Sequence, residues 1–206
     1  MLFYLVSYPL LGAGIKFIDE AFDEKRYSKT LAIAVAPLIG ILWAYTMVTN
    51  PASASILLAV LAGVLFTGKI DNWAHRLGLG VVIGALVVFG VQILVLPLVV
   101  LAIAAFLDER GNDYVDNHRG GWNTSKLGFK ALVYFFDHRW MMKTALLPLV
   151  FFNFIPWYFI LAMILFDESY LLVRWYSTHK ITIPQPSLFS DRTWAAAEGD
   201  STVLSS

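Results

Sequence analysis

Acidic residues at spacings suited to shared ligand binding stand directly after apolar stretches of this chain. Asp19 and Asp23 are four residues apart, so on one helix both carboxylates lie on the same face. Two carboxylates on adjacent turns can share a Mg²⁺ ion, which takes oxygen ligands and usually bridges to phosphate. The later run DERGNDYVDN adds Asp108, Asp113 and Asp116. We predict these five aspartates as magnesium ligands, with an ordinary solvated helix end as the alternative interpretation.

The segment GKIDNWAHRLG carries the densest mixture of functional groups in the chain. Asp71 and His75 are also four residues apart, and a carboxylate beside an imidazole can pass a proton or bind a metal. Lys69 and Arg76 flank this pair with positive charge suited to phosphate, and Arg110 stands in the acidic run that follows. We predict Asp71 and His75 as catalytic residues and the three cations as substrate-binding residues. The alternative is a loop that collects positive charge on the cytoplasmic side of a membrane.

Two of these acidic motifs resemble those of a known family. NDYVD, residues 112–116, is similar to the first aspartate motif of membrane-embedded prenyltransferases, and Asp19-x-x-x-Asp23 is similar to their second. That family uses the motifs to hold Mg²⁺ against an isoprenoid diphosphate, so the resemblance implies a ligand of this class. The two motifs occur here in reverse order, and Gly120 stands where a third aspartate is expected.

The charge distribution predicts the elements that position these residues. All thirty Lys, Arg, Asp and Glu residues fall in four blocks, at 16–29, 69–76, 108–143 and 167–200. The chain is 58% apolar and only 15% charged, whereas soluble domains carry about 25% charged residues. Uncharged apolar runs of roughly 18 or more residues are typical of transmembrane helices. We therefore predict an all-α fold, a polytopic transmembrane helical bundle.

The uncharged runs must be divided to give helices of suitable length. Thr49-Asn50-Pro51 separates helices over 30–48 and 52–68, because proline disfavours helix at the residue before it. Residues 77–107 are expected to form a hairpin that turns near Gly90–Gln92, and residues 144–166 a single pass. This division gives about six spans, within a range of five to seven.

Two further segments have a predicted role at the membrane surface. Residues 127–140 are short, aromatic and basic, so we expect a short interfacial helix. Residues 1–180 are expected to form one transmembrane domain. Residues 181–206 contain two prolines and a polar run and are expected to be an extended or mobile tail.

Charge asymmetry predicts the orientation. Blocks 16–29, 69–76 and 108–143 hold twelve of the fifteen Lys and Arg residues and share one side if 77–107 is a hairpin. Because cytoplasmic connections collect Lys and Arg, we predict these loops in the cytoplasm and the N-terminus outside. The tail would lie outside as well, unless a break between Asn153 and Pro156 turns the last stretch into a re-entrant pair. No acidic residue is then expected at mid-membrane.

Short recurrences suggest how the helices associate. FIDE, KIDN, FLDE and LFDE end the four apolar blocks, either by chance or because a helical hairpin was duplicated. Small residues at four-residue spacing, such as Gly80 and Gly84, let membrane helices approach closely. Packing inside one bundle is the favoured interpretation, and a homo- or hetero-oligomer through these faces is the alternative.

Together these features favour an integral membrane enzyme that acts on a lipid-linked, isoprenoid-type phosphate or diphosphate, with Mg²⁺ at an acidic cytoplasmic-face site. Membrane lipids and the lipid phosphate are the expected partners. The net charge of zero gives no basic field for nucleic acid, and the lack of cysteine excludes disulfides and thiolate metal sites. A structural or accessory subunit of a membrane complex and a cation transporter or channel remain as alternatives.

Overall fold

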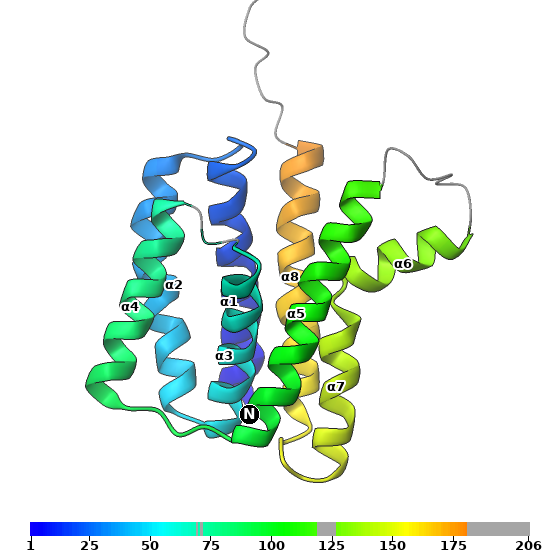
Figure 1. The fold of residues 1–206 in the computed structure, drawn as a ribbon. Coiled ribbons are helices and arrows are strands. Elements are labelled where there is room, and N and C mark those ends of the chain that lie inside the picture. The colour runs from blue at the N-terminus through cyan, green and yellow to red at the C-terminus, as the bar shows by residue number, and fades with distance from the viewer. Residues whose placement is uncertain (69, 71, 119–126, 181–206) are drawn as a thin grey trace, which may run out of the picture.

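The computed structural model describes residues 1–68, 70, 72–118 and 127–180. Within these residues the chain forms eight α-helices and no strand (Figure 1), which confirms the predicted all-helical bundle. The helices are α1 Leu2–Phe22, α2 Lys29–Val48, α3 Pro51–Phe66, α4 Trp73–Phe89, α5 Val95–His118, α6 Leu127–Asp137, α7 Trp140–Phe151 and α8 Tyr158–Lys180. The predicted tail, 181–206, lies outside the described residues.

Two of the described helices, α1 and α2, are long and apolar enough to cross a bilayer. Core helices of soluble proteins and signal sequences share this property. The predicted number of about six spans is therefore not confirmed.

Local sequence explains two of the breaks between helices. Asn50 is the N-cap of α3, where its side-chain oxygen accepts hydrogen bonds from the amides of Ala52 at 2.8 Å and Ser53 at 3.2 Å, and Pro51 suits the first helical position. Gly90 ends α4 with a positive φ of 71°, a conformation that costs glycine little. The predicted breaks near Asn50 and near Gly90 therefore both occur.

The prediction of a single pass over 144–166 is wrong, because two helices occupy this stretch. α7 ends at Phe151 and α8 begins at Tyr158. Between them Asn153 adopts a left-handed φ of 59° and Pro156 lacks an amide hydrogen, so the chain reverses instead of continuing as a helix. The alternative with a break between Asn153 and Pro156 is the one that the structure contains.

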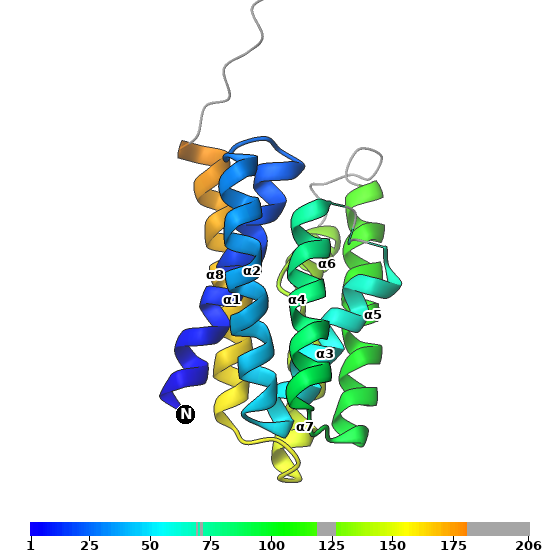
Figure 2. The same ribbon diagram turned by 90° about the vertical axis from the view of Figure 1, so that its left-hand side faces the viewer.

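The helices run roughly side by side, except for α6, which lies across the others (Figures 1 and 2). The end of α1, the start of α4 and the ends of α5 and α8 gather at one end of the bundle. Met1 and the connections near residues 50, 92 and 154 lie at the other end. The charged residues at the end of α1 and at the start of α4 are thus brought to one end, whereas α6 and the start of α7 lie between the two ends. The crosswise α6 occupies most of the segment predicted as an interfacial helix.

Small residues allow the closest helix contacts. A Cβ at Gly12 of α1 would fall on the Phe166 carbonyl oxygen of α8, and a Cβ at Gly40 of α2 would lie 2.7 Å from the Gly78 carbonyl oxygen of α4. In contrast, a Cβ at Gly80 or Gly84 would meet nothing within 4 Å. The expectation of packing inside one bundle is therefore wrong for the Gly80 and Gly84 pair, which faces away from the other described helices.

Candidate functional site

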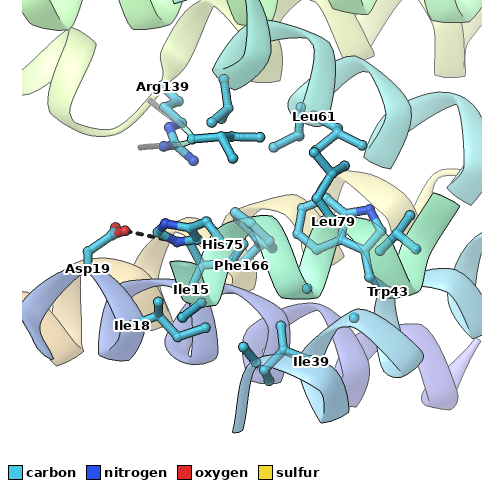
Figure 3. A pocket seen from close by; sticks show the side chains of 18 residues that line it. Ile15, Ile18, Asp19, Ile39, Trp43, Leu61, His75, Leu79, Arg139 and Phe166 are labelled. Carbon is cyan, nitrogen blue, oxygen red and sulfur yellow. Dashed lines mark ion pairs between the residues drawn. The ribbon is translucent and has the colours of Figure 1, made fainter. Parts of the chain in front are cut away.

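An apolar cavity of about 130 Å³ lies among the first four helices. Its wall is built mainly from aliphatic and aromatic side chains, including Ile15, Ile18, Ile39, Trp43, Leu61, Leu79, Val82 and Phe166. Three ionisable side chains, Asp19, His75 and Arg139, line the same cavity (Figure 3). The cavity is therefore amphipathic, with an apolar body and one charged end.

His75 is held in this end by two partners. Its Nε2 lies 3.1 Å from Asp19 Oδ1, and its Nδ1 lies 2.7 Å from the Asn72 amide nitrogen. Asn72 also caps α4, where its side-chain oxygen accepts from the His75 amide at 2.9 Å. With that oxygen committed to the cap, the amide nitrogen donates to Nδ1, and Nε2 carries the proton that it donates to Asp19. His75 thus reaches a ligand only if the ligand replaces one of these partners.

Asp19 connects His75 to α8. Its Oδ2 accepts a hydrogen bond from the Tyr170 hydroxyl at 3.0 Å. The side chains of Asp19 and His75 are 18% and 17% exposed, so this end of the cavity reaches the molecular surface.

Arg139 lies between α6 and α7 and pairs with one acid of α5 and one acid of α8. Its guanidinium lies 3.0 Å from Glu109 Oε1 and 3.7 Å from Asp167 Oδ1, and it packs over the Tyr170 ring with a centroid distance of 5.2 Å. Burial lowers the pKa of Arg139, but the neighbouring carboxylates raise it more, and the net pKa lies above its ordinary value. Arg139 is therefore a permanent cation at the end of the cavity.

Two buried acids complete this ionic cluster. Asp167 also pairs with Lys143 Nζ at 2.6 Å. Asp108 accepts hydrogen bonds from the backbone amides of Met141 at 3.0 Å and Met142 at 2.8 Å. These amides belong to the first turn of α7, which has no partner of its own for them, so Asp108 acts as a cap supplied by α5.

A second cavity of about 100 Å³ lies beside the first. It is mainly polar and is lined by Asp108, Glu109, Asn112, Asp137, Arg139, Asp167, Tyr170 and Arg174, together with three apolar residues. Arg139 and Val64 line both cavities. The guanidinium thus separates an apolar space from a polar one.

The structure brings together only some of the predicted site residues. Asp19 and His75 meet across α1 and α4, whereas Asp108 contributes to the second cavity. Arg76 and Arg110 are exposed and line neither cavity. Lys69 and Asp71 lie outside the described residues.

The predicted magnesium ligands do not form one site in the described part of the chain. Asp23 and Asp116 are exposed, Asp113 is half-buried, and none of the three lines either cavity. Asp19 and Asp108 are held by donors from other helices. No group of three His, Asp or Glu residues among the described residues is arranged to hold a metal ion. The magnesium site stays a prediction, and no step of the function proposed below depends on it.

Five residues of the two cavities and their ionic cluster were not predicted from the sequence: Glu109, Arg139, Lys143, Asp167 and Tyr170. Asp167 lies nine residues after the first residue of α8, which is roughly 14 Å along the helix axis. It therefore stands well inside the helix and not at its end. The recurrent acidic ending of the apolar blocks was the available signal, because Asp19, Asp108 and Asp167 stand at equivalent places in FIDE, FLDE and LFDE. Asp108 and Asp167 line the polar cavity and Asp19 lines the apolar one, and Arg139 lines both.

Comparisons with protein-family models, with curated proteins and with solved structures give no match for this chain. Function must therefore be inferred from the geometry of the two cavities.

Proposed function

We propose that this chain is an integral membrane enzyme that binds a lipid-linked phosphate or diphosphate in the amphipathic cavity. The membrane location is supported by large apolar side chains that are exposed along the sides of the bundle, among them Phe3, Leu10, Leu38, Ile41, Ile83, Val87, Val99, Ile103, Leu147 and Leu161. So many large exposed apolar side chains are unusual on a soluble monomer and indicate contact with lipid or protein. The charges gather toward one end, where a polar headgroup layer would meet them.

The single observation that carries the ligand class is the cavity in which an apolar wall from α1–α4 ends at Arg139, His75 and Asp19. A hydrocarbon chain gains free energy in the apolar part because it leaves water. A phosphate beside Arg139 would accept charge-assisted hydrogen bonds from the guanidinium. A ligand with both parts, a lipid phosphate, fits this arrangement best.

The residues at the charged end supply the chemistry of the proposed reaction. Arg139 neutralises charge on the phosphate oxygens, which is the largest requirement of phosphoryl chemistry. A phosphate oxygen that takes the place of Asp19 would accept a hydrogen bond from Nε2 of His75. As the proposed general acid and base, His75 would take up a proton at Nδ1, in place of the hydrogen bond from the Asn72 amide, and give up the proton on Nε2. The released Asp19 keeps its bond from Tyr170.

Lipids that copurify with the protein test the binding step. Val82 is buried and lines the cavity, whereas its neighbour Ile83 is 52% exposed. Val82→Trp should fill the cavity and reduce the copurified lipid phosphate, as measured by mass spectrometry of the extract, by tenfold or more. Ile83→Trp should retain it. Equal lipid in both variants would refute the assignment of this cavity.

Turnover of the bound lipid tests the catalytic step. His75→Gln should abolish phosphate release or transfer while the copurified lipid remains, because Gln keeps a donor but cannot exchange protons. Arg110→Gln, which removes an exposed cation outside both cavities, should leave turnover unchanged. Full activity of His75→Gln would remove its catalytic role.

One observation favours the accessory-subunit alternative. Gly80 and Gly84 lie on a face of α4 with open space around them, and such faces commonly pack against another membrane helix. Because the chain has no cysteine, Gly84→Cys gives a single thiol for disulfide crosslinking in the native membrane. A specific crosslinked product would favour this alternative, and a monomer alone would disfavour it.

A further inference from the structure

The volume of the apolar cavity limits how much of a lipid chain it can hold. An apolar protein cavity of about 150 Å³ accommodates one benzene-sized molecule, with six carbons. The cavity lined by Asp19, His75 and Arg139 measures about 130 Å³. It therefore holds an apolar group of about five or six carbons, which is far less than a complete acyl or polyprenyl chain.

The residues that line the cavity pack closely on one side of it. Trp43 and Phe166 line the wall and are 6% and 0% exposed, with ring centroids 6.2 Å apart in an edge-to-face contact. Gly40 and Gly78, also in the lining, hold α2 against α4 so closely that a Cβ at Gly40 would lie 2.7 Å from the Gly78 carbonyl oxygen. The packed rings and the two helices in contact close this part of the cavity wall.

We propose that the cavity recognises only the first five or six carbons next to the phosphate, about one isoprene unit, and that longer chains gain no further affinity. This inference rests on the proposed function, since it assigns a chain length to the same site. The substrate class is then a phosphate or diphosphate of a short branched alkyl group, or a longer lipid of which only the unit beside the phosphate is read.

Binding of a series of n-alkyl phosphates from two to ten carbons to the purified full chain in detergent tests the limit. The quantity to follow is the ratio of the dissociation constants of Val82→Trp and wild type, because partition of each ligand into detergent cancels in this ratio. Each carbon buried in the cavity should raise the ratio about fourfold, from the roughly 0.8 kcal/mol gained per buried methylene. We expect the ratio to rise up to about six carbons and then to stop rising.

A smaller substitution checks the same limit in a variant that keeps the fold. Val82→Ala enlarges the cavity. The affinity of this variant should therefore continue to rise with chain length for one or two carbons beyond the limit of the wild type. Ile83→Ala, on the exposed face of the same helix, should leave that length unchanged. A ratio that continues to rise to ten carbons, or an unchanged limit in Val82→Ala, would overturn the inference while leaving lipid binding established. A ratio near one at every length would instead refute the proposed function.

Discussion

Arg139 combines an unusual backbone with an unusual number of partners. Its φ of 47° lies in the left-handed region, which costs a residue with a side chain about 1 kcal/mol or more. The conformation is kept because the guanidinium is held by Glu109, by Asp167 and by the Tyr170 ring. Strain of this kind persists where the surroundings fix a side chain in place, and here it aims one cation at both cavities.

Asp108 should be one of the most sensitive residues to substitution. Asp108→Ala would leave the amides of Met141 and Met142 without their carboxylate partner inside the bundle. Loss of a cap costs about 0.5–2 kcal/mol, and buried unsatisfied amides add to this. We expect a loss of about 2 kcal/mol or more, measured by reversible unfolding in mixed micelles.

Asn117→Ala is the matched control for this measurement. Asn117 lies on the same helix, is exposed and lines neither cavity, so its replacement should change stability by about 0.5 kcal/mol or less. If both variants lost the same stability, the role of Asp108 as a cap for α7 would be wrong.

The contact between α1 and α8 depends on one glycine. A Cβ at Gly12 would fall on the Phe166 carbonyl oxygen and lie 2.7 Å from Ser169 Oγ, and the Ser169 hydroxyl donates to the Pro9 carbonyl oxygen at 2.8 Å. Gly12→Ala must therefore push α8 away from α1. We expect a cost of about 1–3 kcal/mol, as for other overpacked sites.

A glycine-to-alanine substitution on the open face of α4 should instead increase stability. A Cβ at Gly84 meets nothing within 4 Å, so Gly84→Ala should stabilise the helix by about 0.5–1 kcal/mol through its helix propensity. Unfolding measurements on the two variants compare them directly. A loss of stability in Gly84→Ala would indicate that a partner occupies this face.

The sequence predicted helices well where a residue marks their ends, and poorly where none does. Asn50 with Pro51 and Gly90 each stop a helix by a local mechanism. The stretch 144–166 carries no charge, so length alone suggested one span, and the reversal near Asn153 was only an alternative. Hydrophobic composition cannot distinguish one long helix from two short ones that turn back.

The candidate site was less predictable than the helices for a related reason. Spacing along one helix relates residues four apart, and it grouped His75 with Asp71 and Asp19 with Asp23. The observed partner of His75 is Asp19, on a helix that precedes it by more than fifty residues. Contacts between helices depend on which helices are neighbours, and no local sequence pattern predicts which helices these are.

The molecule as a whole is polarised along its length. The end of α1, the start of α4 and the ends of α5 and α8 carry charged residues toward one end, whereas the other end carries Met1 and the uncharged turns (Figure 1). The ion pairs of Asp167 with Arg139 and Lys143 lie deeper in the bundle. The predicted orientation, in which the charged end faces the cytoplasm, stays a prediction.

Accessibility labelling of single cysteines tests the polarity in the native membrane, since the chain has no cysteine of its own. Glu24→Cys, Asn117→Cys and His179→Cys lie at exposed positions toward the charged end, and Gln92→Cys and Phe154→Cys lie at exposed positions toward the other. A membrane-impermeant thiol reagent should modify each set from one side only, the first set from the cytoplasm. Modification of residues 24 and 117 from opposite sides would contradict the bundle as a spanning unit.

Photoaffinity labelling tests most directly the claim that a lipid phosphate lies with its chain in the amphipathic cavity. A short alkyl phosphate with a diazirine at its fourth or fifth carbon would be activated on the purified protein, and the modified residues would be mapped by mass spectrometry. The account predicts labels on cavity residues such as Ile39, Leu79 and Val82, which Val82→Trp abolishes. Labels confined to exposed residues such as Ile41 and Ile83, unchanged by Val82→Trp, would contradict it.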